Sequence, residues 1–339
     1  MRLGAAQPFG PAADLLHHFT GVALSASTVQ RLTVAAGATL QQLEQEETAA
    51  LPVGGGPPAT EPLQLSLDGS MVPLTDGWRE VKLLAIGERQ PDGALTTLSY
   101  AATLGTAETF GTEAEGELVR RGVPGGADVV TVNDGAEWIQ GFLDLHCPRA
   151  PRVLDFAHAA GYLGTAATEA YGEETEAAAR WFTTQRHTLR HGDPEAVLTA
   201  LDALPMGEER DRARRYLAAR RSQISYRDFT EQGWPIGSGC VESAHKGIVQ
   251  TRLKGRGMRW TQPVASAVLA VRVVEANERW GDRWSQVMAQ QRAAQQATTA
   301  ARRQARRPPK RKLVQDGKPT PDHVWRGFRL RGSPRFPRM

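Results

Sequence analysis

The sequence has few cysteines and no long apolar run, and each absence excludes a class of protein. Only two of the 339 residues are cysteines, Cys147 and Cys240. They lack metal-ligand spacing and are too few for a disulfide framework, so a reducing cytoplasm fits. No apolar run approaches the roughly 20 residues of a membrane span. Met1–Gly10 lacks the charged-then-apolar layout of a signal peptide. We therefore expect a cytoplasmic protein with no membrane partner.

The excess of basic charge is concentrated at the C-terminal end. Residues 302–339 contain 13 Lys or Arg and two Asp or Glu, whereas the whole chain contains 41 and 37. The preceding residues are therefore net acidic. A basic tail on an acidic body is typical of an arm that binds a polyanion, although a solubilising tail has the same composition. We expect residues 286–339 to form a basic, disordered tail.

The first 50 residues have a helical pattern interrupted at Gly21. Ser25 or Ser27 can cap the second helix. Two helices joined by a glycine-containing turn predict either a helix-turn-helix or a plain helical hairpin. In a helix-turn-helix, Gln30 and Arg31 would face DNA. A Gly/Pro-rich linker over residues 51–62 marks the expected end of this N-terminal region.

Short strand-like runs and helical runs then alternate. Three runs rich in strand-forming residues, separated by turns, predict an antiparallel meander. After them come a helix and two further strands, each of which precedes a helix. The expected strands are 63–68, 81–87, 95–104, 128–134 and 152–155, and the expected helices are 108–121, 136–145 and 156–171. The order βββαβαβα predicts a mixed sheet with helices on its faces, in the α/β class.

The stretch from about residue 173 to 230 has only helical patterns, and a Gly237-Ser238-Gly239 turn follows it. Ser238 is a candidate cap for a helix that carries Glu242 near its start. An acid at this position can simply complement the helix dipole. His245 could reach the same site, although a solvated side chain is the expectation. The basic residues that follow would line a path for DNA or form a solvated face: Lys246, Arg252, Lys254, Arg256 and Arg259.

Three aspartates, Asp68, Asp134 and Asp155, are each the last residue of a predicted strand. Ligands of open α/β sheets gather at the carboxyl edge of the strands. Carboxylates there can bind hard cations such as Mg²⁺, and two such ions promote phosphoryl transfer. Asp-Gly dipeptides also form turns, so each acid has a structural interpretation. The pattern leaves open whether Asp134 or Asp155 would be the second catalytic acid.

Four runs follow one another in the order Ser66–Gly69, Asn133–Ile139, Leu154–Ala159 and Gly237–Ser243. Together they resemble the DDE transposases of bacterial insertion sequences. More narrowly, they are similar to the Kra-type group, which is related to the Mutator-like transposases. The resemblance covers about residues 60 to 285. It implies a ribonuclease-H-like fold with an all-helical insertion before the catalytic glutamate helix.

The resemblance also implies roles for individual residues. Asp68, Asp134 and Glu242 would be the catalytic residues and the ligands of Mg²⁺, for which Mn²⁺ can substitute. Asp155 and His158 would be a supporting pair, although His158 can instead be a helix-start histidine bonded to Asp155. Members of the family usually carry a longer N-terminal region with cysteine pairs, which this sequence lacks.

The implied activity is metal-dependent cleavage and strand transfer of insertion-sequence DNA ends. Its partners would be double-stranded DNA, both terminal inverted repeats and target DNA, and further copies of the chain in a homo-oligomer on DNA. The expected location is the bacterial nucleoid. Two alternatives are a metal-dependent nuclease of the same fold and a non-catalytic, DNA-binding transposase remnant.

Overall fold

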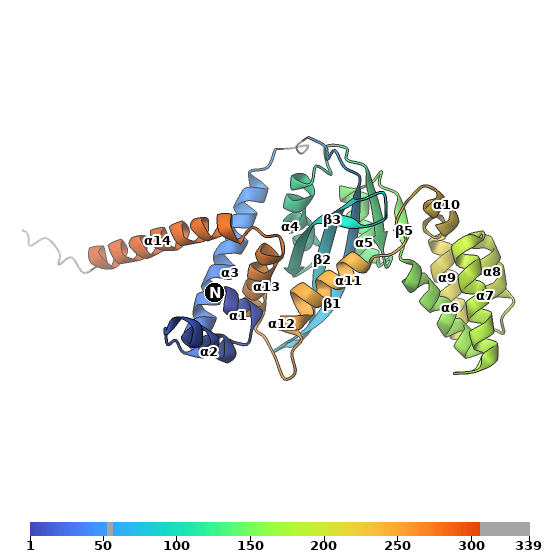
Figure 1. Cartoon of the computed structure of the whole chain (residues 1–339), viewed down its shortest axis with the longest axis horizontal. Helices are drawn as coiled ribbons and strands as arrows, with labels where there is room; N and C mark the ends of the chain where they lie inside the picture. The colour runs from blue at the N-terminus through green and yellow to red at the C-terminus, as the bar shows by residue number, and fades with distance from the viewer. Residues whose placement is uncertain (53–56, 306–339) are drawn as a thin grey trace, which may run out of the picture. The chain divides into compact units, whose positions relative to one another are not determined.

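The computed structural model describes residues 1–52 and 57–305. The central element is a five-stranded sheet with strand order β3-β2-β1-β4-β5 (Figure 1). Three strands form an antiparallel meander, and two shorter strands run parallel to β1. The predicted mixed α/β sheet is confirmed. The strands are β1 (Leu63–Leu74), β2 (Gly77–Arg89), β3 (Leu95–Leu104), β4 (Val129–Asn133) and β5 (Arg152–Leu154).

Helices cover both faces of this sheet because side chains of a strand alternate between its faces. Leu65 and Leu67 of β1 belong to the core that includes Phe110 of α4 and Ile139 of α5. Leu74 is an odd number of residues away from Leu65 and Leu67, so it faces the other side of the sheet and belongs to the core that includes α11 and α13. The helices concerned are α4 (Ala107–Arg120), α5 (Glu137–His146), α11 (Gly239–Ala244) and α13 (Gln262–Ala276).

A helical bundle lies beside β5 and shares a hydrophobic core with β4 and β5 (Figure 1). It occupies the stretch for which the sequence predicts only helices, and α6, which follows β5, packs against it. The hydroxyl of Tyr226 donates to the carbonyl of Leu154, 2.9 Å away, and so ties the bundle to the sheet. The helices are α6 (Phe156–Tyr171), α7 (Glu176–His191), α8 (Pro194–Asp202), α9 (Glu208–Ala219) and α10 (Tyr226–Glu231).

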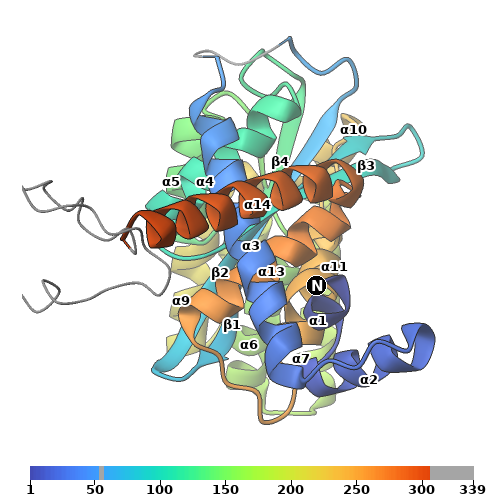
Figure 2. The ribbon, with the colours of Figure 1, turned by 90° about the vertical axis from the view of Figure 1, so that its left-hand side faces the viewer.

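The N-terminal helices α1 (Arg2–Ala6), α2 (Phe9–Thr20) and α3 (Ala26–Ala49) do not form a separate domain. Residues 1–291 are one compact unit, and α3 runs along α13 (Figure 2). The two helices approach closely because Gly37 faces the backbone of Ala267, where a Cβ atom would clash. The expected division at residues 51–62 is therefore wrong, because small residues on α3 join it to the main core. Residues 53–56 of that linker lie outside the described residues.

The first part of the expected disordered tail is helical. Helix α14 extends from Trp280 to Ala305, so residues 286–305 are helical. Alanine and glutamine, which dominate this stretch, favour helix over disorder. The remainder of the predicted tail, residues 306–339, lies outside the described part of the chain. Among the helices that the structure describes, none combines the length and apolar character needed to cross a membrane.

Candidate active site

Asp68 lies inside β1, so the prediction that the strand ends there is wrong. The parallel pairing of β1 with β4 covers Leu63–Leu65, and β1 then continues past the end of β4. The side chain of Asn133, the last residue of β4, accepts a hydrogen bond from the backbone N–H of Leu67. Asp68 is thus the next residue after the last link between the two strands. Asp68 lies at the expected edge of the sheet because the neighbouring strand β4 ends there, although β1 itself continues.

Asp134 follows β4 directly and begins the turn into α5. Its Oδ1 accepts a hydrogen bond from the N–H of Ala136 at 2.9 Å. The next residue, Gly135, has a φ of +77°. A Cβ atom there would lie 2.6 Å from Nε of Arg220 and 2.7 Å from the hydroxyl oxygen of Tyr216. The turn therefore needs glycine both for its backbone conformation and for the close approach of the helical bundle.

The helical bundle holds this turn through two side chains of its α9 region. The hydroxyl of Tyr216 donates to the carbonyl of Asp134. Nη2 of Arg220 donates to the carbonyl of Gly135 at 2.7 Å, and its guanidinium lies 3.9 Å from the ring centroid of Tyr216. Tyr162 of α6 stacks on Tyr216 with ring centroids 4.2 Å apart. We did not predict these contacts, because nothing in the sequence links residue 134 to residues 82 or more positions away.

Asp155, at the end of β5, is buried and has hydrogen bonds to both oxygens. Its Oδ1 accepts from the backbone N–H of His158 at 2.8 Å and so caps α6. Its Oδ2 accepts from the N–H and the hydroxyl of Ser238, at 2.8 and 3.0 Å. The predicted pairing of Asp155 with His158 thus exists through the backbone of His158. The imidazole is exposed and lies edge-on to Tyr162 and Tyr216.

The helix that carries Glu242 begins at Gly239, and Ser238 precedes it. The prediction that the Ser238 side chain caps this helix is wrong, because its hydroxyl donates to Asp155 instead. Two polar residues of β1 hold the segments before and after this helix. Gln64 donates to the carbonyl of Gly237 at 3.1 Å, and Lys254, after the helix, donates to Ser70 at 3.3 Å. This arrangement places the exposed Glu242 near Asp68.

The three predicted catalytic acids influence one another electrostatically. The pKa of Asp68 is raised from 3.8 to about 6, chiefly because the carboxyl is buried; the N–H of Gly69 lowers it, and the negative charges of Asp134, Glu242 and Glu80 raise it. Within the described residues, no three His, Cys, Asp or Glu side chains form a ready-made metal site. Carboxylates without a cation repel one another, which favours an open arrangement. Two aspartates and a glutamate nevertheless supply the oxygen donors that hard cations such as Mg²⁺ prefer.

His245 is almost completely buried against Asp68, which corrects the expectation of a solvated side chain. It is 1% exposed, and its Nε2 lies 3.6 Å from Oδ2 of Asp68. Burial lowers the pKa of this imidazole, which favours the neutral form. The sequence contained a signal for its burial, because residue 245 is one helical repeat from both Val241 and Val249. Here the helix widens into the π-helical segment His245–Gln250, a feature frequent at functional sites.

Four of the five basic residues after Glu242 are exposed, as a DNA-facing surface requires: Lys246, Lys254, Arg256 and Arg259. Arg252 is buried, so its predicted contact with DNA is wrong. Its guanidinium lies 4.9 Å from the ring centroid of Phe9 and 4.6 Å from that of Trp260, and it donates to the carbonyl of Gly4. It thus joins the N-terminal helices to the glutamate helix.

Gln30 and Arg31 are exposed in the first turns of α3, whose N-cap is Ser25. That exposure is compatible with the predicted DNA contacts. Helix α3 is 24 residues long and packs along α13 (Figure 2). These two side chains therefore extend from the main body of the protein.

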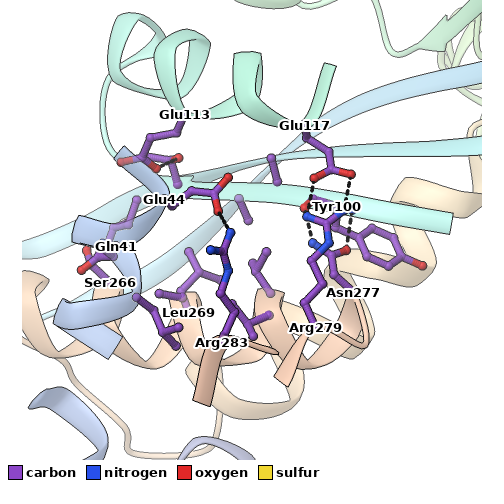
Figure 3. Close-up of a pocket in the computed structure, with 18 of the residues that line it drawn as sticks. Gln41, Glu44, Tyr100, Glu113, Glu117, Ser266, Leu269, Asn277, Arg279 and Arg283 are labelled. Carbon is purple, nitrogen blue, oxygen red and sulfur yellow. Dashed lines mark hydrogen bonds and ion pairs between the residues drawn. The ribbon is translucent and has the colours of Figure 1, made fainter. Parts of the chain in front are cut away.

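A separate pocket lies between α3, β3, α4 and α13 (Figure 3). Most of its charged side chains form ion pairs, whereas Glu113 accepts a hydrogen bond from Thr103. Arg279 donates two hydrogen bonds to Glu117, at 2.7 and 2.8 Å, and Arg283 donates to Glu44 at 3.0 Å. These pairs connect helices that are distant in sequence. We therefore interpret the pocket as part of the packing between the N-terminal helices and the sheet.

Comparison with known proteins does not add to this description. No protein-family model matches the chain, and no curated protein matches it. The function of the acidic site must therefore be inferred from its own residues.

Proposed function

We propose that the chain is a DDE transposase with a ribonuclease-H-like catalytic domain, which cleaves insertion-sequence DNA ends and joins them to target DNA. The observation that carries the proposal is that Asp134, after β4, and Glu242, on α11, lie near enough to the half-buried Asp68 for their charges to raise its pKa. The strand order and the helical bundle inserted between β5 and the glutamate helix support the fold assignment. The bacterial nucleoid would be its place of action.

Asp68, Asp134 and Glu242 would supply the oxygen ligands of Mg²⁺, or of Mn²⁺ in its place. Such ions would activate water or a 3′-hydroxyl and stabilise the leaving oxygen of the phosphodiester. The charges of both other acids act on Asp68, so a cation that neutralises them would also favour the ionised form of Asp68. Tyr216 and Arg220 hold the turn that carries Asp134, and Asp155 holds the turn before Glu242.

Exposed cations would bind the DNA around this site. Lys246 lies one turn after Glu242 on the same helix, and Lys254, Arg256 and Arg259 follow where the helix ends. Contacts with phosphates supply most of the affinity of proteins for DNA and position it without reading its sequence. These residues would therefore orient the backbone relative to the carboxylates.

The test is strand transfer by the Glu242→Gln protein. The substrate is a duplex taken from the DNA that borders the gene, with Mg²⁺ or Mn²⁺ present. Joining should disappear, whereas Glu231→Gln, a change at an exposed glutamate in the helical bundle, should leave it intact. Undiminished joining by Glu242→Gln would overturn the proposal. Wild-type protein that nicks without joining would indicate a nuclease, and binding without either reaction a non-catalytic remnant.

A further inference from the structure

The hairpin formed by β1 and β2 exposes two large apolar side chains at its tip. The strands remain paired up to Leu74 and Gly77. Trp78 is 59% exposed and Met71 is 45% exposed. Met71 pairs with Glu80 and Pro73 pairs with Trp78, so Met71 and Trp78 are diagonal neighbours on one face of the hairpin. Single exposed apolar residues are common, but adjacent ones indicate a binding surface.

A basic loop lies beside this tip. The N–H of Thr75 donates to the carbonyl of Trp260 at 2.8 Å, and the N–H of Trp260 donates to the carbonyl of Pro73 at 3.3 Å. The loop before Trp260 is thereby fixed against the hairpin, and both extend to the bottom of Figure 1. Lys82 is buried and paired with Glu80, so it does not contribute to the surface charge. Over residues 70–82 and 254–260 the exposed charged residues are four cations and one acid, so the surface is net positive. The exposed cations are Arg79, Lys254, Arg256 and Arg259.

The tip is also at a fixed distance from the acidic site, because Asp68 is on the same strand. At a strand rise of about 3.3 Å per residue, Met71 lies roughly 10 Å beyond Asp68, and Trp78, opposite Pro73, roughly 17 Å beyond it. These distances correspond to about three to five base pairs of B-form DNA. The hairpin projects past the edge at which the carboxylates gather. Asp68 and Met71 have opposite parity, so their side chains leave opposite faces of β1. A duplex that lies along the edge of β1 beyond the end of β4 would therefore meet both the carboxylates and the tip.

We propose that this tip, formed by Met71, Trp78, Lys254, Arg256 and Arg259, is a contact site for double-stranded DNA. The inference rests on the proposed function, which puts a phosphate at the carboxylates. The cations bind backbone phosphates, and Trp78 and Met71 press against the base pairs about three to five positions away, as apolar wedges do in a DNA groove. Charge favours DNA over a second copy of the chain, because two copies of the same basic surface would repel each other and protein–DNA interfaces are strongly basic.

The test measures binding of the full-length Glu242→Gln protein to a short duplex from the border of the gene, so that catalysis does not contribute. Adding Met71→Ala and Trp78→Ala should weaken binding about tenfold. It should leave the salt dependence unchanged, because neither side chain is charged. Leu145→Ala with Met206→Ala is the matched control, since both side chains are exposed elsewhere. Arg256→Ala with Arg259→Ala should instead reduce the slope of affinity against salt by about 2.

A fluorescent adenine analogue placed at successive base pairs locates the contact. Its signal should change at about three to five base pairs from the cleaved phosphate and lose that change without Trp78. Equal affinity and fluorescence for the Met71/Trp78 variant and its control would overturn the inference. So would an altered oligomeric state with unchanged DNA affinity, which would indicate a surface for a second copy. A wild-type chain that binds in this way but never cleaves would contradict only the proposed function.

Discussion

Asp134 and Asp155 follow neighbouring parallel strands, yet the structure gives them different surroundings. Asp155 is buried, and its two oxygens accept three hydrogen bonds from Ser238 and the start of α6. Asp134 is half-buried, accepts one hydrogen bond among the described residues, and contributes its charge to the environment of Asp68. An acid after a strand can therefore stabilise the fold through its hydrogen bonds, as Asp155 does, or keep an oxygen available for a ligand, as we propose for Asp134. The number of hydrogen-bond partners distinguishes the two cases.

The largest expected difference between the two acids is in activity. Asp134→Asn should reduce strand transfer about a thousandfold, because metal-assisted stabilisation of a phosphoryl transition state is worth several kcal/mol. Its thermal unfolding midpoint should be almost unchanged. Transfer rates and circular dichroism melting curves of the same preparation provide the measurement. An Asp134→Asn protein with nearly full activity would contradict the proposed difference in role between Asp134 and Asp155.

The second difference is in stability. Asp155→Ala should lower the free energy of unfolding by about 3 kcal/mol, because it removes a helix cap and leaves the buried N–H and hydroxyl of Ser238 without their acceptor. Urea denaturation of Asp155→Ala and Asp134→Ala measures this effect. A loss below about 0.5 kcal/mol for Asp155→Ala, the range of ordinary surface changes, would refute the structural role.

The third difference concerns pH. The pKa of Asp68 is raised from 3.8 to about 6, so the folded state favours its protonated form. Without divalent cations, its contribution to stability is therefore fully present below pH 3.8 and is lost as the pH rises through about 6. Asp68→Asn should abolish this loss. Asp134→Asn should shift it to lower pH by removing a nearby charge, whereas Asp155→Asn should not. Unfolding curves against pH, recorded with a chelator, would contradict the account if Asp155→Asn produced the shift.

The smallest expected effect concerns Tyr216, which holds the turn that carries Asp134. Tyr216→Phe removes the hydroxyl that donates to the carbonyl of Asp134 but keeps the stack with Tyr162. Strand transfer should fall about tenfold, since small displacements of a catalytic group are costly, while stability should fall by about 1 kcal/mol. Tyr171→Phe, at an exposed tyrosine at the end of α6, is the control. Equal activity of the two variants would show that Tyr216 does not position Asp134.

Local patterns predicted the elements of the fold but not their continuation or partners. Alternating apolar residues and turns were sufficient for the order of strands and helices around the sheet. The end of β1 was predicted too early, because Asp68-Gly69 resembles a turn and the pairing with β2 that extends the strand is a long-range contact. Arg252 was predicted on the surface, because a charged residue gives no indication that Phe9 and Trp260 will enclose it.

The same limit applies within the candidate site. Four motifs identified Asp68, Asp134 and Glu242 as the acids to examine. The assignment of Asp155 needed the structure, since its main partner, Ser238, is 83 residues away. The contacts of Tyr216 and Arg220 with the Asp134 turn are equally remote. Partners of this kind depend on how the helical bundle docks, which no local spacing encodes.

The most direct test of the central claim is Mn²⁺ binding, followed by electron paramagnetic resonance at neutral pH in proteins confirmed to be folded by circular dichroism. The account predicts that Asp134→Asn and Glu242→Gln weaken binding at least about tenfold, because each removes a charged oxygen donor. Asp155→Asn should bind as the wild type does. Normal Mn²⁺ affinity in Asp134→Asn together with a loss in Asp155→Asn would contradict the account.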